Sequence, residues 1–474
     1  MLPGVAIHEE VRYHALACDY DGTLASGGRV ARETARALRR LRESGRRLVM
    51  VTGRQMGDLL AVCPEVGLFD RVVAENGAVV YAPASGRWRA LAEAPPSALI
   101  SALRRRGVTP MSLGQVVVAT ERPHDVAAAQ VIRDLRLDWR IIFNREAVMM
   151  LPSRVDKATG LAAALEELGI SAHNVVAIGD GENDDRLLAS CECGIAVANA
   201  VPELKTHADL VTSAESGDGV VELIERLVTL DLVELEPRLR RHDIPVGTDD
   251  RGVEVRLPAH GTTVLVVGAP AAATSAVAAG LVERIAACGY QEGIVLPTRD
   301  DAMYPGAIVV GDAVHLPRPT EVAAALDHPL QNAVLRLHAV AAADRPRPFE
   351  SLLSQLFEMR ARTGRPHWIV IDEADQLCAA ASLGSARRPE DLLGLILVAA
   401  EPRDVAPAAL AAVDVVVSVG ESPGATLQSF AEAVGESALA PLPPDVGAGE
   451  AIAWWWRRSE PPFRLRDLGA PATP

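Results

Sequence analysis

The stretch His-Ala-Leu-Ala-Cys-Asp-Tyr-Asp-Gly-Thr, residues 14–23, runs from an apolar segment directly into two aspartates. Residues 14–18 have the composition of a buried strand, and Asp19 and Asp21 follow in the loop at its end. In an open α/β sheet, ligands bind at the carboxyl ends of the strands. Two carboxylates beside a phosphate need a cation to balance their charge, and the hard, oxygen-liganded Mg²⁺ suits them. The stretch therefore predicts a magnesium-dependent site at the end of this strand.

Other strand ends and one helix start carry the remaining polar groups that such a site needs. Strand 47–51 ends at Thr52, whose hydroxyl can donate to a phosphoryl oxygen, and Lys157 opens a helix and supplies positive charge. Strand 174–178 leads into Gly-Asp-Gly-Glu-Asn-Asp at 179–184, which adds Asp180 and Asp184. Because these strands alternate with helical stretches, we predict an α/β fold around a parallel sheet. Each motif alone is also typical of a turn or a helix cap, so the chemical interpretation depends on the set.

Taken together, the segments resemble the motifs of the haloacid-dehalogenase superfamily. The resemblance is carried, in order, by Asp19-Tyr20-Asp21-Gly22-Thr23, Val51-Thr52-Gly53-Arg54, Lys157 and the segment 179–184. Segments 75–78, 194–200, 208–209 and 217–220 are similar to its Cof-type sugar-phosphatase branch. The match extends over roughly residues 12–228 and implies a Rossmann-like core that hydrolyses phosphate esters through an aspartyl-phosphate.

The resemblance also implies a role for each residue. Asp19 is the implied nucleophile, and Asp21 is implied to protonate the leaving oxygen and then to activate water. The implied ligands of Mg²⁺ are Asp19, Asp21 through its backbone carbonyl, Asp180 and Asp184. The residues expected to hold the phosphoryl group or the rest of the substrate are Thr52, Gly53, Asn76, Lys157 and Asn183.

The rhythm of strands and helices changes between residues 84 and 150. We expect the hydrolase core over residues 1–83 and 151–230, with a small α/β cap inserted over 84–150 that excludes water and selects the substrate. The cap is compact, which is similar to phosphoglycolate-type and sucrose-phosphate-type enzymes. Within it, Arg122, His124 and Arg145 stand at expected strand ends, where each is either a contact for a substrate anion or an exposed solubilising charge.

The second half begins with a linker and a lead-in hairpin over 231–258, followed by another α/β segment over 259–440. It resembles P-loop ATPases of the DNA-translocase and conjugative-transfer type. The Walker A position keeps Gly268 and Ser275, but Ala273 replaces the second glycine and Thr274 replaces the lysine. Asp372 and Glu373 resemble an intact Walker B. Two interpretations stay open: a weakened nucleotide site, or a P-loop fold kept as a scaffold or regulatory module.

The last segment, 441–474, is rich in proline and glycine, and we expect it to be irregular apart from the aromatic run at 454–456. It contains three consecutive tryptophans at 454–456, followed by Arg457 and Arg458. Such a run can stack nucleic-acid bases or bind a partner, but packing against the domain is the favoured interpretation in so acidic a chain.

The bulk composition limits the classes of function. A net charge of −15 over 474 residues disfavours a general binder of nucleic acid or anionic membranes. The 6 cysteines are scattered, no long apolar run occurs, and no signal-peptide pattern opens the sequence, so we expect a cytoplasmic protein without disulfides. The leading hypothesis is a magnesium-dependent phosphatase of a small phosphorylated metabolite; the alternative is a nucleotide-responsive regulatory protein. Assembly into oligomers is possible.

Overall fold

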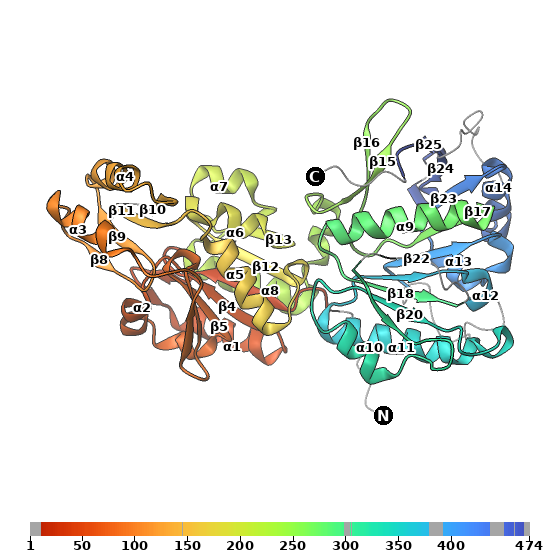
Figure 1. Ribbon diagram of the computed structural model, residues 1–474, viewed down its shortest axis with the longest axis horizontal. Coiled ribbons are helices and arrows are strands. Elements are labelled where there is room, and N and C mark those ends of the chain that lie inside the picture. Colours follow the sequence, from red (N-terminus) through yellow and green to blue (C-terminus); the bar gives the residue numbers. More distant parts are fainter. Residues whose placement is uncertain are drawn as a thin grey trace. The chain divides into compact units, whose positions relative to one another are not determined.

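The structure is a computed structural model that describes residues 11–144, 146–297, 304, 306–378, 392–436, 450–458 and 460–468. The chain forms two compact units, Val11–Leu239 and the part from Arg240 onward (Figure 1). The predicted core end at residue 230 lies before η5 (Val233–Arg238), whose Leu235 packs in the first unit together with Leu239.

The first unit is built on an eight-stranded sheet in the order β14-β13-β12-β1-β4-β5-β6-β7. Its neighbouring strands are parallel except for the pairs β5–β6 and β6–β7. The strands are β1 (Ala15–Asp19), β4 (Arg47–Val51), β5 (Arg71–Ala74), β6 (Val79–Ala82), β7 (Arg87–Ala90), β12 (Val175–Gly179), β13 (Cys193–Ala196) and β14 (Leu210–Val211), with a separate pair β2 (Ala25–Ser26) and β3 (Arg29–Val30). Every residue of β1 is buried, because this strand lies in the middle of the sheet.

Helices pack on this sheet and bury their apolar sides. In α1 (Arg32–Glu43), for example, Leu38 and Leu41 are buried whereas most arginines are exposed. The other helices are α2 (Met56–Val62), α5 (Lys157–Leu168), α6 (Asp185–Ala189), α7 (Pro202–His207) and α8 (Ser216–Leu230), with short 3₁₀ turns η1 (Pro64–Leu68), η2 (Glu75–Gly77), η3 (Ala172–Asn174) and η4 (Glu182–Asp184). The predicted α/β fold of the first half is therefore confirmed.

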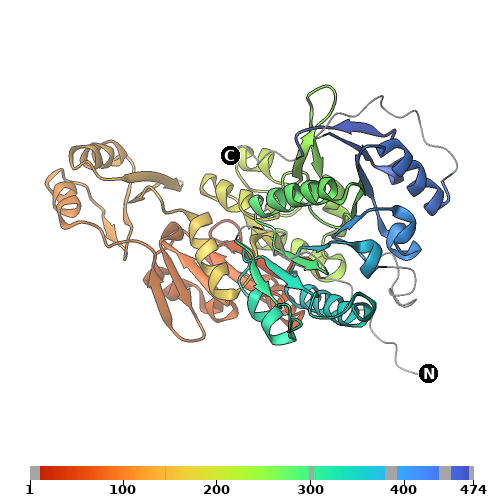
Figure 2. The same cartoon turned by 45° about the vertical axis from the view of Figure 1, so that its right-hand side comes forward.

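The predicted inserted module is a separate four-stranded antiparallel sheet, β10-β11-β9-β8, with two helices. Its elements are α3 (Ser97–Arg105), β8 (Ser112–Leu113), β9 (Val118–Glu121), α4 (Asp125–Asp134), β10 (Trp139–Asn144) and β11 (Ala147–Pro152). Both helices lie on the same side of the cap sheet (Figure 2) and share a core with Val118 and Met150. Strand β9 begins only at Val118, because the N–H groups of residues 115–117 donate to a side chain instead of a neighbouring strand.

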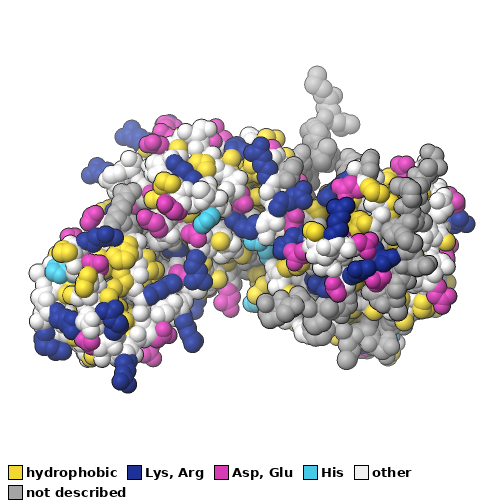
Figure 3. All heavy atoms as spheres, turned by 90° about the horizontal axis from the view of Figure 1, so that it is seen from above, with side chains coloured by type: hydrophobic (Ala, Val, Ile, Leu, Met, Phe, Trp, Pro, Cys, Tyr) yellow, Lys and Arg dark blue, Asp and Glu magenta, His cyan; other side chains and the backbone are white. Residues whose placement is uncertain are grey.

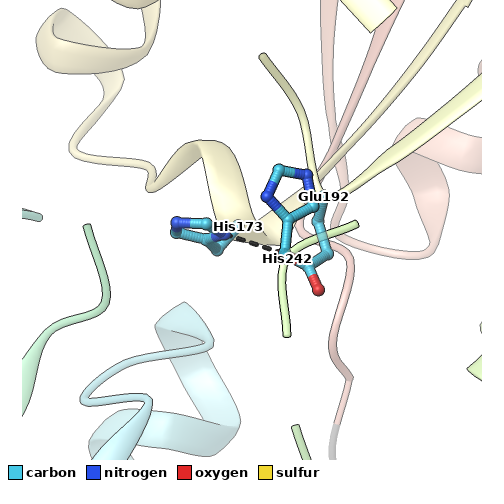
Figure 4. Close-up of side chains that lie close together, drawn as sticks. All are labelled: His173, Glu192 and His242. Atoms are coloured by element: carbon cyan, nitrogen blue, oxygen red, sulfur yellow. Dashed lines mark hydrogen bonds and ion pairs between the residues drawn. The ribbon is translucent and has the colours of Figure 1, made fainter. Parts of the chain in front are cut away.

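At the amino ends of the strands, the first unit holds a buried ion pair. Glu192 is buried and accepts a hydrogen bond from Arg12 Nη2 at 2.5 Å. Nδ1 of His173 lies 2.7 Å from the other carboxylate oxygen of Glu192, Oε2 (Figure 4). Glu192 precedes β13, Arg12 precedes β1 and His173 precedes β12. The group therefore lies at the edge of the sheet opposite to Asp19, which is the last residue of β1.

The second unit has a nine-stranded sheet in the order β19-β20-β18-β21-β22-β17-β23-β24-β25. Its first seven strands in that order are parallel, and β24 and β25 are antiparallel additions. The strands are β17 (Val264–Ala269), β18 (Glu292–Leu296), β19 (Ile308–Val310), β20 (Ala333–Arg336), β21 (Trp368–Ile371), β22 (Leu395–Ala399), β23 (Val415–Gly420), β24 (Ala451–Trp454) and β25 (Phe463–Leu465), preceded by the predicted hairpin β15 (Ile244–Thr248) and β16 (Glu254–Leu257).

Both faces of this second sheet are buried. Alternate residues of β17 enter two different cores: Leu265 and Val267 pack against one set of helices, and Val264 and Val266 pack against α9 and the β15–β16 hairpin. The described helices and 3₁₀ turns are α9 (Ala271–Ala287), α10 (Pro319–Ala325), α11 (Pro346–Thr363), α12 (Ala374–Leu377), α13 (Pro407–Ala412), α14 (Pro423–Val434), η6 (Ala342–Asp344), η8 (Pro402–Asp404) and η9 (Trp456–Arg458).

The prediction of an irregular tail after residue 441 was wrong for residues 451–454 and 463–465. Two strands form there because β23 would otherwise expose its edge, and β24 pairs with it. Trp454 and Trp455 are 7% and 4% exposed and pack in the two different cores. Nε1 of Trp456 donates to Val413 O at 2.7 Å. The favoured interpretation, that the tryptophans pack against the domain, is confirmed.

The surface of the first unit carries charges of both signs. Lys and Arg side chains are interspersed with Asp and Glu on the face seen in Figure 3. None of the helices in the described ranges combines the length and the hydropathy that a membrane span requires.

Candidate active site

Asp19 is the last residue of β1, the strand that lies between β12 and β4. Because all three strands are parallel, their carboxyl ends bring Asp19 next to Asp180, which follows β12, and Thr52, which follows β4. All three side chains are buried. The polar groups that the sequence places at three strand ends therefore meet at one edge of the sheet.

Lys157 reaches this edge from the first residue of α5. The helix starts there because Asp156 caps it, accepting a hydrogen bond from Thr159 N at 2.8 Å. Lys157 Nζ lies 2.6 Å from Asp19 Oδ1 and 2.6 Å from Asp184 Oδ1. Burial by itself lowers the pKa of Lys157, but the two carboxylates outweigh it and raise this pKa above its usual value. The lysine is therefore held as a buried ammonium.

Three carboxylates converge around the ammonium. Ligand oxygens of Asp19, Asp180 and Asp184 lie within 4.8 Å of one another. Thr23 Oγ1 donates to Asp180 Oδ1 at 3.0 Å, and Asp184 Oδ2 accepts from the backbone N–H groups of residues 180 and 181. These bonds fix the orientation of the carboxylates of Asp180 and Asp184.

The charge balance of this cluster fits a divalent cation. When ionised, the three carboxylates oppose a single ammonium, so two negative charges remain unbalanced. Burial, with contributions from Asp184 and Asp180 that the Lys157 ammonium only partly offsets, raises the pKa of Asp19 well above its usual value. A hard divalent ion bound by carboxylate oxygens would restore neutrality, and the donor set consists of oxygen atoms only.

The side chain of Asp21 lies outside this cluster and forms an ion pair with an arginine. Arg54 Nε lies 2.7 Å from Asp21 Oδ2, and its Nη2 lies 2.8 Å from Asp21 Oδ1. Arg54 also contacts Asp58 at 2.5 Å and stacks over the ring of Tyr20. The side chain of Asp21 is 32% exposed, so it faces the open side of the site. Two parallel N–H···O bonds hold its carboxylate in one orientation.

A backbone hydrogen bond joins the loop after β4 to the turn after β5. Thr52 and the neighbouring Gly53 are buried, and Thr52 O accepts a hydrogen bond from Asn76 N at 3.0 Å. Asn76 has a left-handed backbone, φ 55°, which aims its side chain at two other elements. Its Oδ1 accepts from Asn183 Nδ2 at 2.9 Å, and its Nδ2 lies 2.8 Å from Met149 Sδ of the cap. Asn76 thus joins the loop of Asp184 to the cap.

Glu75, beside Asn76, binds the cap more directly. Its side chain is 1% exposed and accepts three backbone N–H groups of the cap, from Gln115 at 2.9 Å, Val116 at 3.0 Å and Val117 at 3.1 Å. A carboxylate with three N–H donors is fully solvated by the protein without a counter-ion. In the sequence, Glu75 is part of the segment 75–78, and no local pattern predicts a function for it.

The first unit has relatives among known proteins. The haloacid dehalogenase-like hydrolase family matches residues 16–103 and 141–224. The phosphoglycolate phosphatase of Methanothermobacter thermautotrophicus is 32% identical over 222 residues, which cover 45% of this chain and 98% of that protein. The chain belongs to the haloacid dehalogenase-like hydrolases. It is a phosphoric monoester hydrolase of this family.

Another relative and one solved structure match a similar share of the chain. The phosphoglycolate phosphatase of Methanopyrus kandleri is 33% identical over 221 residues, 44% of this chain and 95% of that protein. A crystal structure of a haloacid dehalogenase-like hydrolase from Bacteroides thetaiotaomicron aligns with 46% of this chain and 100% of its own, at 22% identity and a TM-score of 0.39.

The cap residues singled out from the sequence are engaged within the cap of the hydrolase. The guanidinium of Arg122 lies 4.7 Å from the ring centroid of Phe143, and Nε2 of His124 lies 2.8 Å from Thr109 O. Arg145 lies outside the described residues. These contacts of Arg122 and His124 lie within the cap. Arg140, which was not among the predicted site residues, contacts Val155 and Asp156 of the core.

In the second unit of the hydrolase, the residues compared with Walker A do not form a loop. Helix α9 begins at Ala271, so Thr274 and Ser275 are already helical, and both hydroxyls donate back to Ala271 O at 2.9 and 3.0 Å. Gly268 packs so closely on β23 that a Cβ atom there would lie 2.1 Å from Val419 O. Without a loop, no row of backbone N–H groups in these residues can surround a phosphate chain.

Asp372 and Glu373 lie where the sequence predicts them, directly after β21. Asp372 is buried, and its Oδ1 accepts from Glu373 N at 3.0 Å. Glu373 has a left-handed backbone, φ 51°. Asp372 and Glu373 therefore lie at a strand end, as predicted, whereas residues 268–275 do not form the loop that a nucleotide site would need.

Proposed function

We propose that the first unit hydrolyses the phosphate monoester of a small metabolite through an aspartyl-phosphate on Asp19. The observation that supports this most is the position of Asp19, 2.6 Å from a buried ammonium and within a cluster of three carboxylates. A carboxylate at the end of a central strand, with one oxygen beside an ammonium, is suited to attack phosphorus. Its family membership and the names of its relatives point in the same direction.

The two chemical steps use residues of this chain. Asp19 attacks phosphorus and the ester oxygen departs with a proton from Asp21, which gives an aspartyl-phosphate and an alcohol. Water then attacks the phosphorus, Asp21 takes its proton, and phosphate leaves Asp19. Lys157 and Thr52 hold the phosphoryl oxygens and balance their charge in both steps.

We propose Mg²⁺ as the cofactor, held by Asp19, Asp180, Asp184 and the backbone carbonyl of Asp21. When bound, it supplies the positive charge that the two excess negative charges of the cluster and the phosphate require. The resemblance assigns the same residues, and the cluster of oxygen donors within 4.8 Å supports the assignment.

For the substrate, we propose a phosphoglycolate-like or sugar-phosphate ester. The support comes from the two relatives named above, both phosphoglycolate phosphatases matched over 95% or more of their length. We also propose a cytoplasmic location. None of the 6 cysteines, all of which lie in the described ranges, forms a disulfide, as is usual in a reducing compartment.

Phosphate release tests the proposal. Wild-type protein with Mg²⁺ should release phosphate from p-nitrophenyl phosphate and from phosphoglycolate, and Asp19→Asn should lose the activity by about a thousandfold or more. Glu203→Gln, a change of an exposed carboxylate on α7, serves as the matched control. A wild-type protein inactive on a broad panel of phosphate esters would overturn the proposal.

A nucleotide-responsive role of the second unit is the second candidate. It is favoured by the strand order, in which β22 separates β17 from β21 as in the additional-strand P-loop ATPases that the sequence resembles, and by Asp372 at the end of β21. Calorimetry with ATP and ADP tests it, and an absence of binding heat would exclude it.

A further inference from the structure

The cap strand β10 presents one side to the core, and Arg140 lies on that side. Trp139 and Ile141 pack with α3 and α4 in the core of the cap. Ile142, on the opposite side of the strand, packs with Ala74 and Val79 of the hydrolase core. Because side chains alternate along a strand, Arg140 shares the side of Ile142. It is therefore directed toward the hydrolase core rather than toward the cap helices.

Arg140 contacts the segment that leads to Lys157. Its Nη2 donates to Val155 O at 2.7 Å and lies 3.2 Å from Asp156 Oδ2. Asp156 is the capping residue of α5, directly before Lys157. Strand β10 also lies against η4, the turn that contains Asp184. Arg140 thus stands beside two of the elements that form the aspartate cluster.

The charge of this arrangement is not balanced. Arg186 Nη1 also forms an ion pair with Asp156 Oδ2, at 2.6 Å. Two guanidinium groups therefore share one carboxylate, and one positive charge is in excess. Arg186 is 67% exposed and is solvated, whereas the Arg140 side chain is only 31% exposed. Nε of Arg140 is buried and has no hydrogen-bond partner in the described part of the chain. A buried N–H without an acceptor is costly, so an acceptor supplied by a ligand would stabilise it.

We propose that Arg140 binds a carboxylate carried by the substrate whose phosphoryl group lies at Asp19 and Lys157. The inference rests on the proposed function and narrows its substrate to phosphate monoesters that bear a second acidic group. An arginine recognises a carboxylate through charge-assisted N–H···O bonds. Because Nη2 of Arg140 already contacts Val155 O and Asp156 Oδ2, the ligand would use the other N–H groups of this guanidinium. Arg140 is then the residue through which the cap distinguishes an acidic phosphoester from a neutral one of similar size.

Calorimetry on the Asp19→Asn protein with Mg²⁺ separates binding from hydrolysis. The ligands are phosphoglycolate and 2-hydroxyethyl phosphate, which carry a carboxylate and a neutral hydroxyl next to the same phosphate group. We expect phosphoglycolate to bind at least about tenfold more tightly. Adding Arg140→Gln should remove this preference, while the dissociation constant of 2-hydroxyethyl phosphate should change by less than about threefold. Arg140→Lys should keep part of the preference because the charge remains.

Arg186→Gln is the matched control, because it removes the other partner of Asp156 without touching the cap. It should leave the preference intact. The inference is overturned if Arg140→Gln weakens both ligands equally, if Arg186→Gln has the same effect, or if the starting protein does not discriminate between the ligands. Phosphate release by wild-type protein is a separate readout: binding through Arg140 without turnover would overturn the proposed function and leave this inference standing.

Discussion

Gly114 rests directly on the buried carboxylate of Glu75. A Cβ atom at position 114 would lie 2.4 Å from Glu75 Oε2, closer than any side chain tolerates. The absence of a side chain at 114 lets the next three N–H groups converge on the carboxylate. The cap is therefore fastened to the core by an anion whose partners are all backbone groups.

Replacing this carboxylate by an amide should loosen the cap. In Glu75→Gln, the side-chain NH₂ would face backbone N–H donors, so the cost should be about 1–3 kcal/mol of stability. Hydrogen exchange at residues 115–117 should accelerate, and thermal denaturation should report the loss. Glu121→Gln, an exposed change on β9, is the control. Unchanged exchange at 115–117 would show that the three hydrogen bonds do not hold the cap.

Divalent metal should stabilise the first unit through the aspartate cluster. Magnesium at about a hundred times its dissociation constant adds about 2.7 kcal/mol to the folded state, which raises the melting temperature. Asp180→Asn removes one oxygen ligand and should reduce this shift, whereas Glu203→Gln should retain it. Differential scanning calorimetry with and without Mg²⁺ measures the effect. An equal shift in wild type and Asp180→Asn would place the metal elsewhere.

The positions of the site residues were predictable because each follows a local pattern. Asp19, Thr52 and Asp180 are polar residues that end apolar runs, and Lys157 opens a helix; a parallel sheet then brings them to one edge. The prediction needed no knowledge of long-range pairing beyond the parallel arrangement itself. For this reason, the fold and the cluster could both be predicted from the sequence.

Residues whose importance depends on a distant partner could not be identified in this way. Glu75 binds N–H groups 40 to 42 residues further along the chain, and no local pattern marks that contact. Arg140 has the appearance of an exposed residue in an alternating strand, although its partners lie in the core. Strand β24 was missed because its stability comes from pairing with β23, across a segment rich in proline and glycine.

The second unit should not bind ATP tightly. The ammonium that would contact the phosphates is replaced by Thr274, and the residues of the expected loop are helical from Ala271 onward. Calorimetry with ATP and Mg²⁺ should give no binding heat in the micromolar range. Restoring the motif with Ala273→Gly and Thr274→Lys should not be sufficient, because the helix start would still occupy the loop. Binding by the wild-type protein would favour the nucleotide-responsive alternative.

The stability of the second unit should depend on pH through Glu292. This residue starts β18, and its Oε2 accepts from Asn332 Nδ2 at 3.0 Å. Within the described residues, its Oε1 and Nε1 of the paired Trp368 have no hydrogen-bond partner. Burial raises the pKa of Glu292 well above its usual value. The folded protein therefore keeps a proton at Glu292 that the unfolded chain loses above about pH 4.3.

The sign of the effect follows from this difference in bound protons. As pH rises above about 4.3, the folded state binds more protons than the unfolded state, so the free energy of unfolding falls by up to about 1.4 kcal/mol per pH unit until the folded-state pKa is reached. Glu292→Gln keeps an acceptor for Asn332 but cannot ionise, so its stability relative to wild type should increase between pH 5 and 8. Melting temperatures over this range, with the exposed Glu283→Gln as control, measure the difference. A constant difference between Glu292→Gln and wild type across the range would mean that Glu292 is ionised in the folded protein.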